Sequence, residues 1–498
     1  MEQARKKRFF VNFRKHWNTP KDGELVSNKE LTTFSVGGMG IKSINSMLTY
    51  LQLAPTCLLI ATVYGLSPSN IMWLFIITNI IGIVKTPFVS LMVDNTRTKM
   101  GKFRPYLLWA GIPSVIGVIG LTWFIPLSST IMVRIILIGI FINLLSIAQP
   151  LYNNAYMGIS QVITPNSAER TKIMSFSEFF ANLGPSIIQF ALPTLAGIFF
   201  GVNGMLNIWA YRIFLPIFSI SGFILGLLTM YTTKERVINT EDNITKIKFF
   251  NGIKQIGRNK YFWIVTISKA FDGFKGILTL LLGWICAYQI GRSDLQGIIL
   301  TIVAVAYTPG MLLAPIFMKK FGPRKFGFGA HLFNCVFALL MLFTFRQGFI
   351  FFVIALFFYN FALGPQYIIQ NSILSDGFDY QQDREGIRIE GFAQNFQLMI
   401  TTIGGILSTI VFTYIYQKNG IIADAVTGLT DYGYYLTNAS IREPIIQSII
   451  IIVIIASILS AIPYLFCDMN AERTKAIRES LENKKRLKEE RFINKEIM

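Results

Sequence analysis

The sequence predicts an all-α membrane protein of about twelve transmembrane helices, arranged in two pseudo-symmetric bundles of about six. Hydrophobic residues make up 52% of the 498 residues, which is unusual for a soluble protein. Apolar runs of about twenty residues recur along the chain, each long enough to cross a hydrocarbon core of roughly 30 Å. A basic, Gly- and Pro-containing turn at 94–106 has a weaker counterpart at 319–325, which indicates two halves built alike.

Each apolar run predicts one helix, and the boundaries of the helices are defined to within several residues. We expect helices at 32–60, 69–93, 105–125, 129–157, 173–200, 210–231, 261–289, 295–318, 326–346, 348–374, 390–416 and 444–467.

The connectors between these runs predict the orientation of the protein. Connectors after odd-numbered runs are short or poor in charge, such as 65–69, whereas those after even-numbered runs carry Lys and Arg. Because basic loops remain in the cytoplasm, both termini are expected there. The expected segments are a cytoplasmic N-terminal tail at 1–30, an N-terminal bundle at 31–231, a cytoplasmic linker at 232–260, a C-terminal bundle at 261–467 and a charged cytoplasmic tail at 468–498.

Composition excludes several classes of function. The net charge of +19 could indicate nucleic-acid binding, but the cations gather at the ends of the apolar runs and in the two tails, where they favour a lipid bilayer as the partner. The four cysteines lie in apolar runs without CxxC spacing and are expected to be buried free thiols. Only His16 and His331 are histidines, and no nucleophile–base pair occurs in the runs. We therefore expect no enzyme, no catalytic residue, no metal and no cofactor.

Polar residues recur at helical spacing within seven of the runs. Polar groups are costly in a membrane and usually face the interior of a bundle or water. The pattern therefore predicts a central solute cavity, although each polar residue alone could serve to hold helices together. The expected lining residues are Lys42, Asn45, Thr49, Lys85, Asn153, Glu178, Asn182, Lys269, Asp272, Gln394 and Gln397.

Ionisable residues within the runs leave three interpretations open. A cavity with an excess of cations would suit an anionic or zwitterionic solute. Alternatively, lysine ammonium groups could stand where a coupling cation would otherwise bind, or the charges could pair for structural reasons alone. The residues concerned are Lys42, Lys85, Glu178, Lys269, Asp272 and Lys275.

The basic turn also carries a resemblance to a known family. Asp94-Asn95-Thr96-Arg97, followed by 101–106 (GKFRPY), resembles the loop between the second and third helices of the glycoside–pentoside–hexuronide:cation symporter family. That family belongs to the major facilitator superfamily. Further matching stretches lie at 35–40, 163–164, 169–170, 179–182 and 390–397, with Asp376 and Asp379-Tyr380 before the last of them.

This resemblance implies a major facilitator fold that imports sugars together with Na⁺, Li⁺ or H⁺ by alternating access. The two basic turns are expected to form a cytoplasmic hinge or gate, made by Asp94, Arg97, Gly101, Lys102 and Arg104, with Lys319 and Arg324 in the second half.

The family's functional positions carry different residues in this chain. Its paired cation-binding aspartates fall on Gly82 and Thr86, and its sugar-contacting aspartates fall on Lys42 and Asn153. A family arginine falls on Glu178, and a family lysine falls on Thr402. Hard cations need clustered oxygen ligands, so cation coupling is expected to be altered or lost, and the choice between Na⁺ and H⁺ stays open.

The sequence thus predicts a monomeric secondary transporter in the cytoplasmic membrane that moves a sugar, glycoside or uronide. Two alternatives remain, a lysophospholipid-type carrier and a non-transporting membrane sensor or scaffold.

Overall fold

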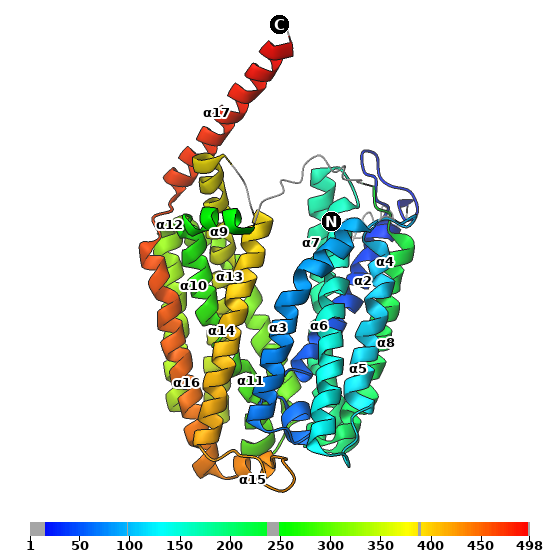
Figure 1. Cartoon of the computed structure of the whole chain (residues 1–498), viewed down its shortest axis with the longest axis vertical. Helices are drawn as coiled ribbons and strands as arrows, with labels where there is room; N and C mark the ends of the chain where they lie inside the picture. Colours follow the sequence, from blue (N-terminus) through cyan, green and yellow to red (C-terminus); the bar gives the residue numbers. More distant parts are fainter. Residues whose placement is uncertain (1–14, 97, 237–248, 387–389, 497–498) are drawn as a thin grey trace, which may run out of the picture. The chain divides into compact units, whose positions relative to one another are not determined.

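The protein is built from helices. A computed structural model describes residues 15–96, 98–236, 249–386 and 390–496 (Figure 1). Ten helical segments in this part of the chain are long and apolar enough to cross a membrane. One of them, α12 (Leu295–Thr344), consists of two helices that meet at Gly322, where φ is 75° and only glycine is unstrained. The expected all-α membrane fold is confirmed.

The helices follow the predicted order. Before the linker lie α2 (Asn28–Ser46), α3 (Pro68–Asn95), α4 (Arg104–Trp109), α5 (Gly111–Trp123), α6 (Ile131–Val162), α7 (Ser167–Phe200) and α8 (Ile208–Thr232). After it lie α9 (Phe249–Gly257), α10 (Lys260–Asp272), α11 (Ile277–Trp284), α12, α13 (Phe349–Glu385), α14 (Glu390–Lys418), α15 (Tyr432–Thr437), α16 (Ala439–Ala461) and α17 (Ala471–Glu496).

Contacts between Cα atoms divide the chain into two units. Unit 1 comprises Met1–Asn243, Gly283–Ile298 and Gly420–Asn438, and unit 2 comprises Ile244–Leu282, Ile299–Asn419 and Ala439–Met498. Two short segments from the second half of the sequence therefore pack within unit 1. There the Tyr432 hydroxyl donates to the Leu66 carbonyl at 2.9 Å, and the Thr430 amide donates to the Gly65 carbonyl at 2.9 Å.

The first apolar run is not one continuous helix. Helix α2 ends at Ser46, a 3-10 turn covers Met47–Tyr50, and a π-helix covers Leu58–Val63. Pro55 lies in the irregular stretch between them. Because proline lacks an amide hydrogen and its ring clashes with a preceding carbonyl, it breaks the helix there.

Small residues let α2 pack closely against its neighbours in unit 1, α7 and α8 (Figure 1). A Cβ atom added to Gly40 would lie 2.3 Å from the Gly222 carbonyl oxygen of α8. One added to Gly184 of α7 would lie 2.3 Å from the Met39 carbonyl oxygen of α2. Close backbone approach through small residues is typical of helices that associate in membranes. It brings the polar face of α2 next to α7.

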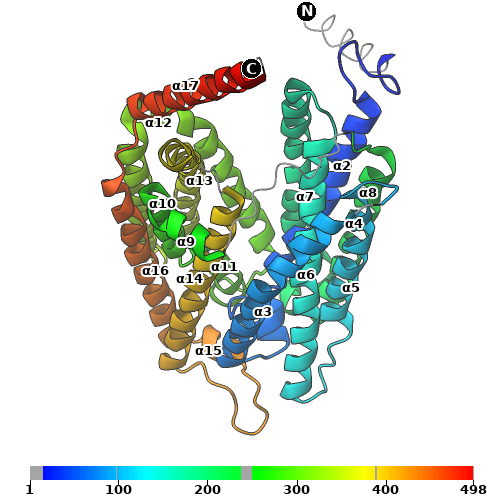
Figure 2. The same ribbon diagram turned by 45° about the horizontal axis from the view of Figure 1, so that its top comes forward.

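Helix α10 is the central element of unit 2. It packs against α13, α14 and α16 (Figure 2). Tyr261, Phe262 and Val265 of α10 join Tyr464 in a buried apolar cluster. The charged residues 473–495 lie within α17, whose Ser480 hydroxyl donates to Asp383 of α13 at 2.6 Å. The four cysteines are buried and unpaired, as predicted; they are Cys57, Cys286, Cys335 and Cys467.

Candidate functional site

The first polar cluster joins α2 to α7 in unit 1. The Lys42 ammonium forms an ion pair with the Glu178 carboxylate and donates to the Asn182 carbonyl oxygen at 3.2 Å. The Lys42 side chain is 18% exposed and that of Glu178 is 35% exposed, so the pair keeps one accessible edge. The cluster presents a cation, an anion and an amide to that edge, which together can hydrogen-bond hydroxyl groups or a carboxylate.

A second cluster in unit 1 joins α3 to α6. The Lys85 ammonium donates to the Ser146 hydroxyl at 2.5 Å. One turn away from Ser146, the Asn143 amide lies 3.3 Å from the Thr78 hydroxyl. Among the residues that the structure describes, Lys85 makes no ion pair. Its charge therefore lies in a membrane-spanning helix with a hydroxyl as its closest partner.

A third cluster joins α10 to α14 in unit 2. The Lys269 ammonium donates to the Gln397 carbonyl oxygen at 3.2 Å, and the Gln397 amide donates to the Thr266 hydroxyl at 3.1 Å. Gln397 is buried, whereas Gln394 on the same helix is exposed. Lys269 is thus paired with an amide. The carboxylate of Asp272, three residues along the chain, has other partners.

Asp272 lies at the centre of a fourth cluster, where the helix of the seventh apolar run is interrupted between α10 and α11. The Lys275 ammonium lies 2.6 Å from the Asp272 carboxylate and 2.8 Å from Nδ1 of His331. The same carboxylate accepts hydrogen bonds from Gln370 at 2.8 Å and from Ser460 at 2.9 Å. His331 is not among the site residues predicted from the sequence. The signal was present, because an ionisable residue within a membrane span is itself a candidate.

The other predicted residues form no comparable group. Asn45 is half-buried, and its carbonyl oxygen is buried without a hydrogen-bond partner in the described structure. Thr49 and Asn153 are half-buried. Three further positions are equivalent to ionic residues of the family. Gly82 lies on α3, Thr402 donates to the Leu398 carbonyl at 2.8 Å, and the side chain of Thr86 lies outside the described part.

The predicted hinge between α3 and α4 is held by one carboxylate. Glu235, which follows α8, accepts hydrogen bonds from the backbone amides of Lys102, Phe103 and Arg104 at 2.8 to 2.9 Å. Gly101 takes a φ of 111° beside it, and a Cβ atom there would lie 2.4 Å from the Glu235 carboxyl carbon. The carboxylate thus fixes the backbone of the hinge to the end of α8.

Ion pairs anchor the start of the linker next to this hinge. The Arg236 guanidinium pairs with Glu30 at 2.7 Å and donates to the Ile163 carbonyl at 3.0 Å. The hydrogen bond to Glu30 raises the pKa of Arg236. Among the other predicted hinge residues, Arg97 and the side chain of Asp94 lie outside the described residues. Lys319 and Arg324 are exposed on either side of Gly322.

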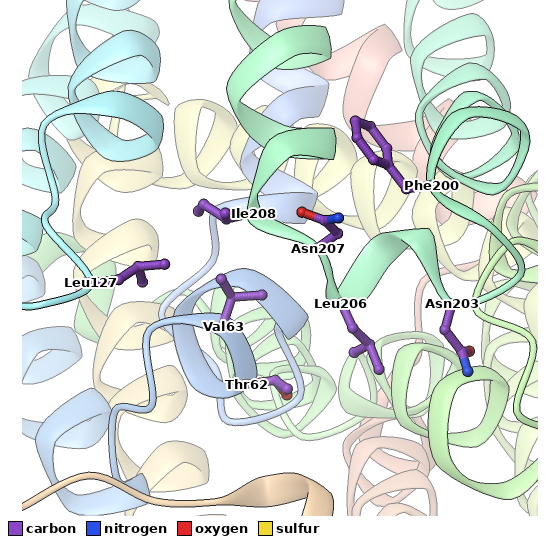
Figure 3. A pocket seen from close by; sticks show the side chains of 8 residues that line it. All are labelled: Thr62, Val63, Leu127, Phe200, Asn203, Leu206, Asn207 and Ile208. Carbon is purple, nitrogen blue, oxygen red and sulfur yellow. The ribbon is translucent and has the colours of Figure 1, made fainter.

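A surface recess of about 600 Å³ lies elsewhere in unit 1 (Figure 3). It contains none of the predicted site residues. Its two amide side chains have structural roles, because Asn207 accepts from the Trp209 amide at 3.0 Å and Asn203 accepts from the Ser293 amide at 3.3 Å. We therefore assign no solute site there. Its lining residues are Thr62, Val63, Leu127, Phe200, Asn203, Leu206, Asn207 and Ile208.

Comparison with known proteins shows the family to which the chain belongs. The sequence profile of the family described as MFS/sugar transport protein matches residues 33–469. The chain belongs to this family. The resemblance to glycoside–pentoside–hexuronide:cation symporters is thereby confirmed, and the family is one of multi-pass membrane transporters and not of enzymes.

Proteins similar to this chain are named as symporters or sugar transporters. The inner membrane symporter YicJ of Escherichia coli (strain K12) is 23% identical over 95% of this chain and 99% of its own length. The isoprimeverose transporter of Lactiplantibacillus pentosus is 25% identical over 73% of this chain and 75% of its own. The uncharacterised symporter YnaJ of Bacillus subtilis (strain 168) is 28% identical, and the match spans 57% of this chain but only 60% of YnaJ.

Solved transporter structures share the fold. The nucleoside transporter NupG superposes with a TM-score of 0.61 over 88% of this chain and 98% of its own, at 14% sequence identity. At that identity the likeness concerns the fold alone, which is the major facilitator fold predicted from the sequence.

Proposed function

We propose that this family member moves a sugar, glycoside or uronide across the cytoplasmic membrane as a monomer, with both termini in the cytoplasm. The ion pair of Lys42 and Glu178, with Asn182 beside it, carries the proposal. Glu178 and Asn182 lie in α7, which is long and apolar enough to cross a membrane, and Lys42 reaches them from the neighbouring α2, yet the group keeps an accessible edge. Polar groups in that setting mark solute pathways. Their mixture of donors and acceptors suits a solute rich in hydroxyl groups.

The relatives support a sugar as the solute class. The family is described by sugar transport, and one relative is named for isoprimeverose. A lysophospholipid-type carrier and a non-transporting sensor are not favoured, because the named relatives are symporters and sugar transporters.

Replacing Glu178 tests the solute site. We expect Glu178→Ala to abolish uptake of labelled isoprimeverose or of a glucuronide by reconstituted vesicles. Membrane insertion should persist, because Asn182 still accepts a hydrogen bond from Lys42. The matched control is Glu24→Ala, which removes a Lys–Glu pair at an exposed position of unit 1 where Lys172 is 52% exposed. Normal uptake by the Glu178 variant would remove this residue from the site.

We further propose that Na⁺ does not drive this transporter. In the family, paired carboxylates of the second helix hold the coupling cation, and here Gly82 and Thr86 stand at those positions. The Lys85 ammonium lies on the same helix and is held by Ser146. A fixed cation repels a second cation, and a site of hydroxyl and amide groups without carboxylates binds Na⁺ poorly.

The Na⁺ proposal predicts equal uptake in matched salts. We expect vesicles to take up the same amount of labelled solute when external NaCl is replaced by choline chloride of equal ionic strength. The Lys85→Met variant should remain insensitive to Na⁺, since loss of the ammonium does not restore the carboxylates. Stimulation of the unmodified protein by Na⁺ would refute this part of the proposal.

A further inference from the structure

The seventh membrane-spanning segment breaks where two of its charges lie. Helix α10 ends at Asp272, α11 begins at Ile277, and Lys275 lies in the turn between them. In transporters, discontinuous helices of this kind carry substrate and coupling-ion sites, because their free backbone groups and side chains point into the bundle. A purely structural ion pair would not require a broken helix.

The cluster at this break is internally satisfied and electrically balanced. Lys275 bridges Asp272 at 2.6 Å and the neutral acceptor Nδ1 of His331 at 2.8 Å. The other ring nitrogen of His331 lies 3.3 Å from the Ser268 hydroxyl. With one carboxylate, one ammonium and a neutral imidazole, the net charge of the cluster is zero.

Access to the cluster is unequal. The side chain of His331 is fully buried and that of Lys275 is 2% exposed, whereas that of Asp272 is 24% exposed. Asp272 is thus the most exposed member of the three. Gln370 of α13 and Ser460 of α16 hold its two oxygens in place.

The ionisable groups around the cluster come from several elements. Lys269 of α10 and Tyr359 of α13 act on the Asp272 charge, as does Tyr464 in the 3-10 turn after α16. From α12 comes His331, and α14 contributes Gln397, which holds Lys269. Two lysines, Lys269 and Lys275, therefore surround one carboxylate, and their charges repel a further metal cation. A proton can still bind, because it forms a covalent bond with a carboxylate oxygen.

The ligand set argues against a metal ion. Asp272 brings a single carboxylate, which an ammonium already occupies. Na⁺ and the divalent cations prefer several oxygen ligands. In the described parts of the chain, no group of three or more His, Cys, Asp and Glu side chains could hold a metal.

We propose that Asp272, Lys275 and His331 form a proton-binding site that couples solute movement to H⁺. This inference rests on the proposed transport function, and it assigns Asp272 the role of a proton carrier in place of a solute contact. One proton adds to an Asp272 oxygen and gives the neutral acid. Lys275 keeps its charge and its hydrogen bond to His331, so its bond to Asp272 is released without leaving the ammonium unpartnered. Proton loss restores the ion pair.

Accumulation and exchange of solute together separate proton coupling from solute binding. When vesicles take up isoprimeverose, a pH gradient of one unit supports up to about tenfold accumulation if one proton moves with each solute. We expect this from the unmodified protein. The double variant Asp272→Asn with Lys275→Gln keeps the site neutral without a lone buried charge. We expect its accumulation ratio to fall to about 1 while exchange of internal for external solute continues, because exchange requires no net proton movement.

A readout without solute tests the proton site directly. Infrared difference spectra of the purified protein between acidic and neutral pH should show the carbonyl band of a protonated carboxylic acid, and Asp272→Asn should lose it. His331→Leu should move the midpoint of that band to lower pH, because leucine offers no hydrogen-bond acceptor and Lys275 then has Asp272 as its remaining partner. His16→Leu, a change of the other histidine, is the matched control and should leave the midpoint in place.

The outcomes distinguish the two proposals. If the folded double variant still accumulates solute in response to the gradient, or loses exchange as well as accumulation, the proton-coupling role is wrong. An unchanged carboxylic band in Asp272→Asn would also overturn it. If the unmodified protein exchanges no solute, the proposed function fails instead, and the infrared band still decides whether Asp272 binds a proton.

Discussion

Charged side chains within the helical bundles have polar partners from neighbouring helices, which lipid cannot supply. An unpaired charge at the centre of a bilayer costs at least a few kcal/mol. Lys42 has both a carboxylate and an amide, whereas Lys85 has a hydroxyl. The two lysines are chemically identical, but in the described structure only the first is paired with a carboxylate. The local partners therefore assign different roles to residues of one type.

A carboxylate at the end of the membrane-spanning part of unit 2 makes stability depend on pH. Asp468 accepts hydrogen bonds from Lys260 at 2.5 Å and from the Tyr261 hydroxyl at 2.7 Å. Burial raises the pKa of Asp468, but these two hydrogen bonds and the charges of Lys260 and Arg473 outweigh it and bring the pKa to about 2. Since the pKa in the folded state is below the ordinary value of about 3.9, the stabilisation is present above pH 4 and is lost as the pH falls toward 2.

We therefore expect Asp468→Asn to lower the melting temperature of the detergent-solubilised protein at pH 7. The difference from the unmodified protein should shrink as the pH falls from about 4 to about 2. Thermal unfolding followed by circular dichroism at a series of pH values measures this. A difference that stays constant down to pH 2 would show that Asp468 does not contribute through its charge.

At the scale of the element, helix packing in unit 1 depends on residues without side chains. Helix α2 lies so close to α7 and α8 that glycines occupy the crossings. This closeness allows Lys42 on α2 to reach Glu178 on α7. The polar cluster is thus a consequence of how the helices cross, and it requires small residues at the crossings.

Substituting Gly40 tests this packing. A methyl group there would lie 2.3 Å from the Gly222 carbonyl oxygen, so the helices must separate. We expect Gly40→Ala to destabilise the protein by about 1–3 kcal/mol, the usual cost of overpacking. Thermal unfolding with a thiol-reactive dye reports it, because the four cysteines are buried.

The control for this experiment is Gly257→Ala. An added Cβ atom at Gly257 would meet no atom within 4 Å. We expect the melting temperature of that variant to stay close to that of the unmodified protein. Equal melting temperatures for the Gly40 and Gly257 variants would contradict the packing argument.

At the scale of the whole molecule, the two halves of the sequence are not the two packing units. Gly283–Ile298 and Gly420–Asn438 come from the second half but pack in unit 1. Tyr432 contacts the ring of Trp284 and donates to the Leu66 carbonyl. The fully buried thiol of Cys286 lies two residues from Trp284 and reports on these contacts.

We expect Tyr432→Ala to raise the rate at which maleimide modifies Cys286 by about tenfold or more, since loss of a buried aromatic side chain costs about 3–5 kcal/mol. Mass spectrometry of the intact membrane protein, resolved by site, measures the rate. Cys467, which is buried in unit 2, serves as the internal control and should react at an unchanged rate. Equal acceleration at both cysteines would indicate general unfolding instead.

Much of the fold followed from the sequence because hydrophobic length and charge placement are local properties. Apolar runs predict membrane helices wherever they occur, and the motif at 94–106 identifies the family without tertiary information. Polar spacing also singled out Lys42, Glu178, Lys269 and Asp272. The break of the first run near Pro55 was less visible, because a single proline does not always end a helix.

The partners of these residues were decided by the tertiary structure. Sequence spacing allowed Asp272 to pair with Lys269, but the folded chain pairs it with Lys275 and brings His331 from α12 beside them. Glu235 gave no signal, although it fixes the hinge at Lys102 and Arg104. The physical reason is that hydropathy depends on each residue and its neighbours along the chain, whereas an ion pair between helices depends on how those helices cross and rotate.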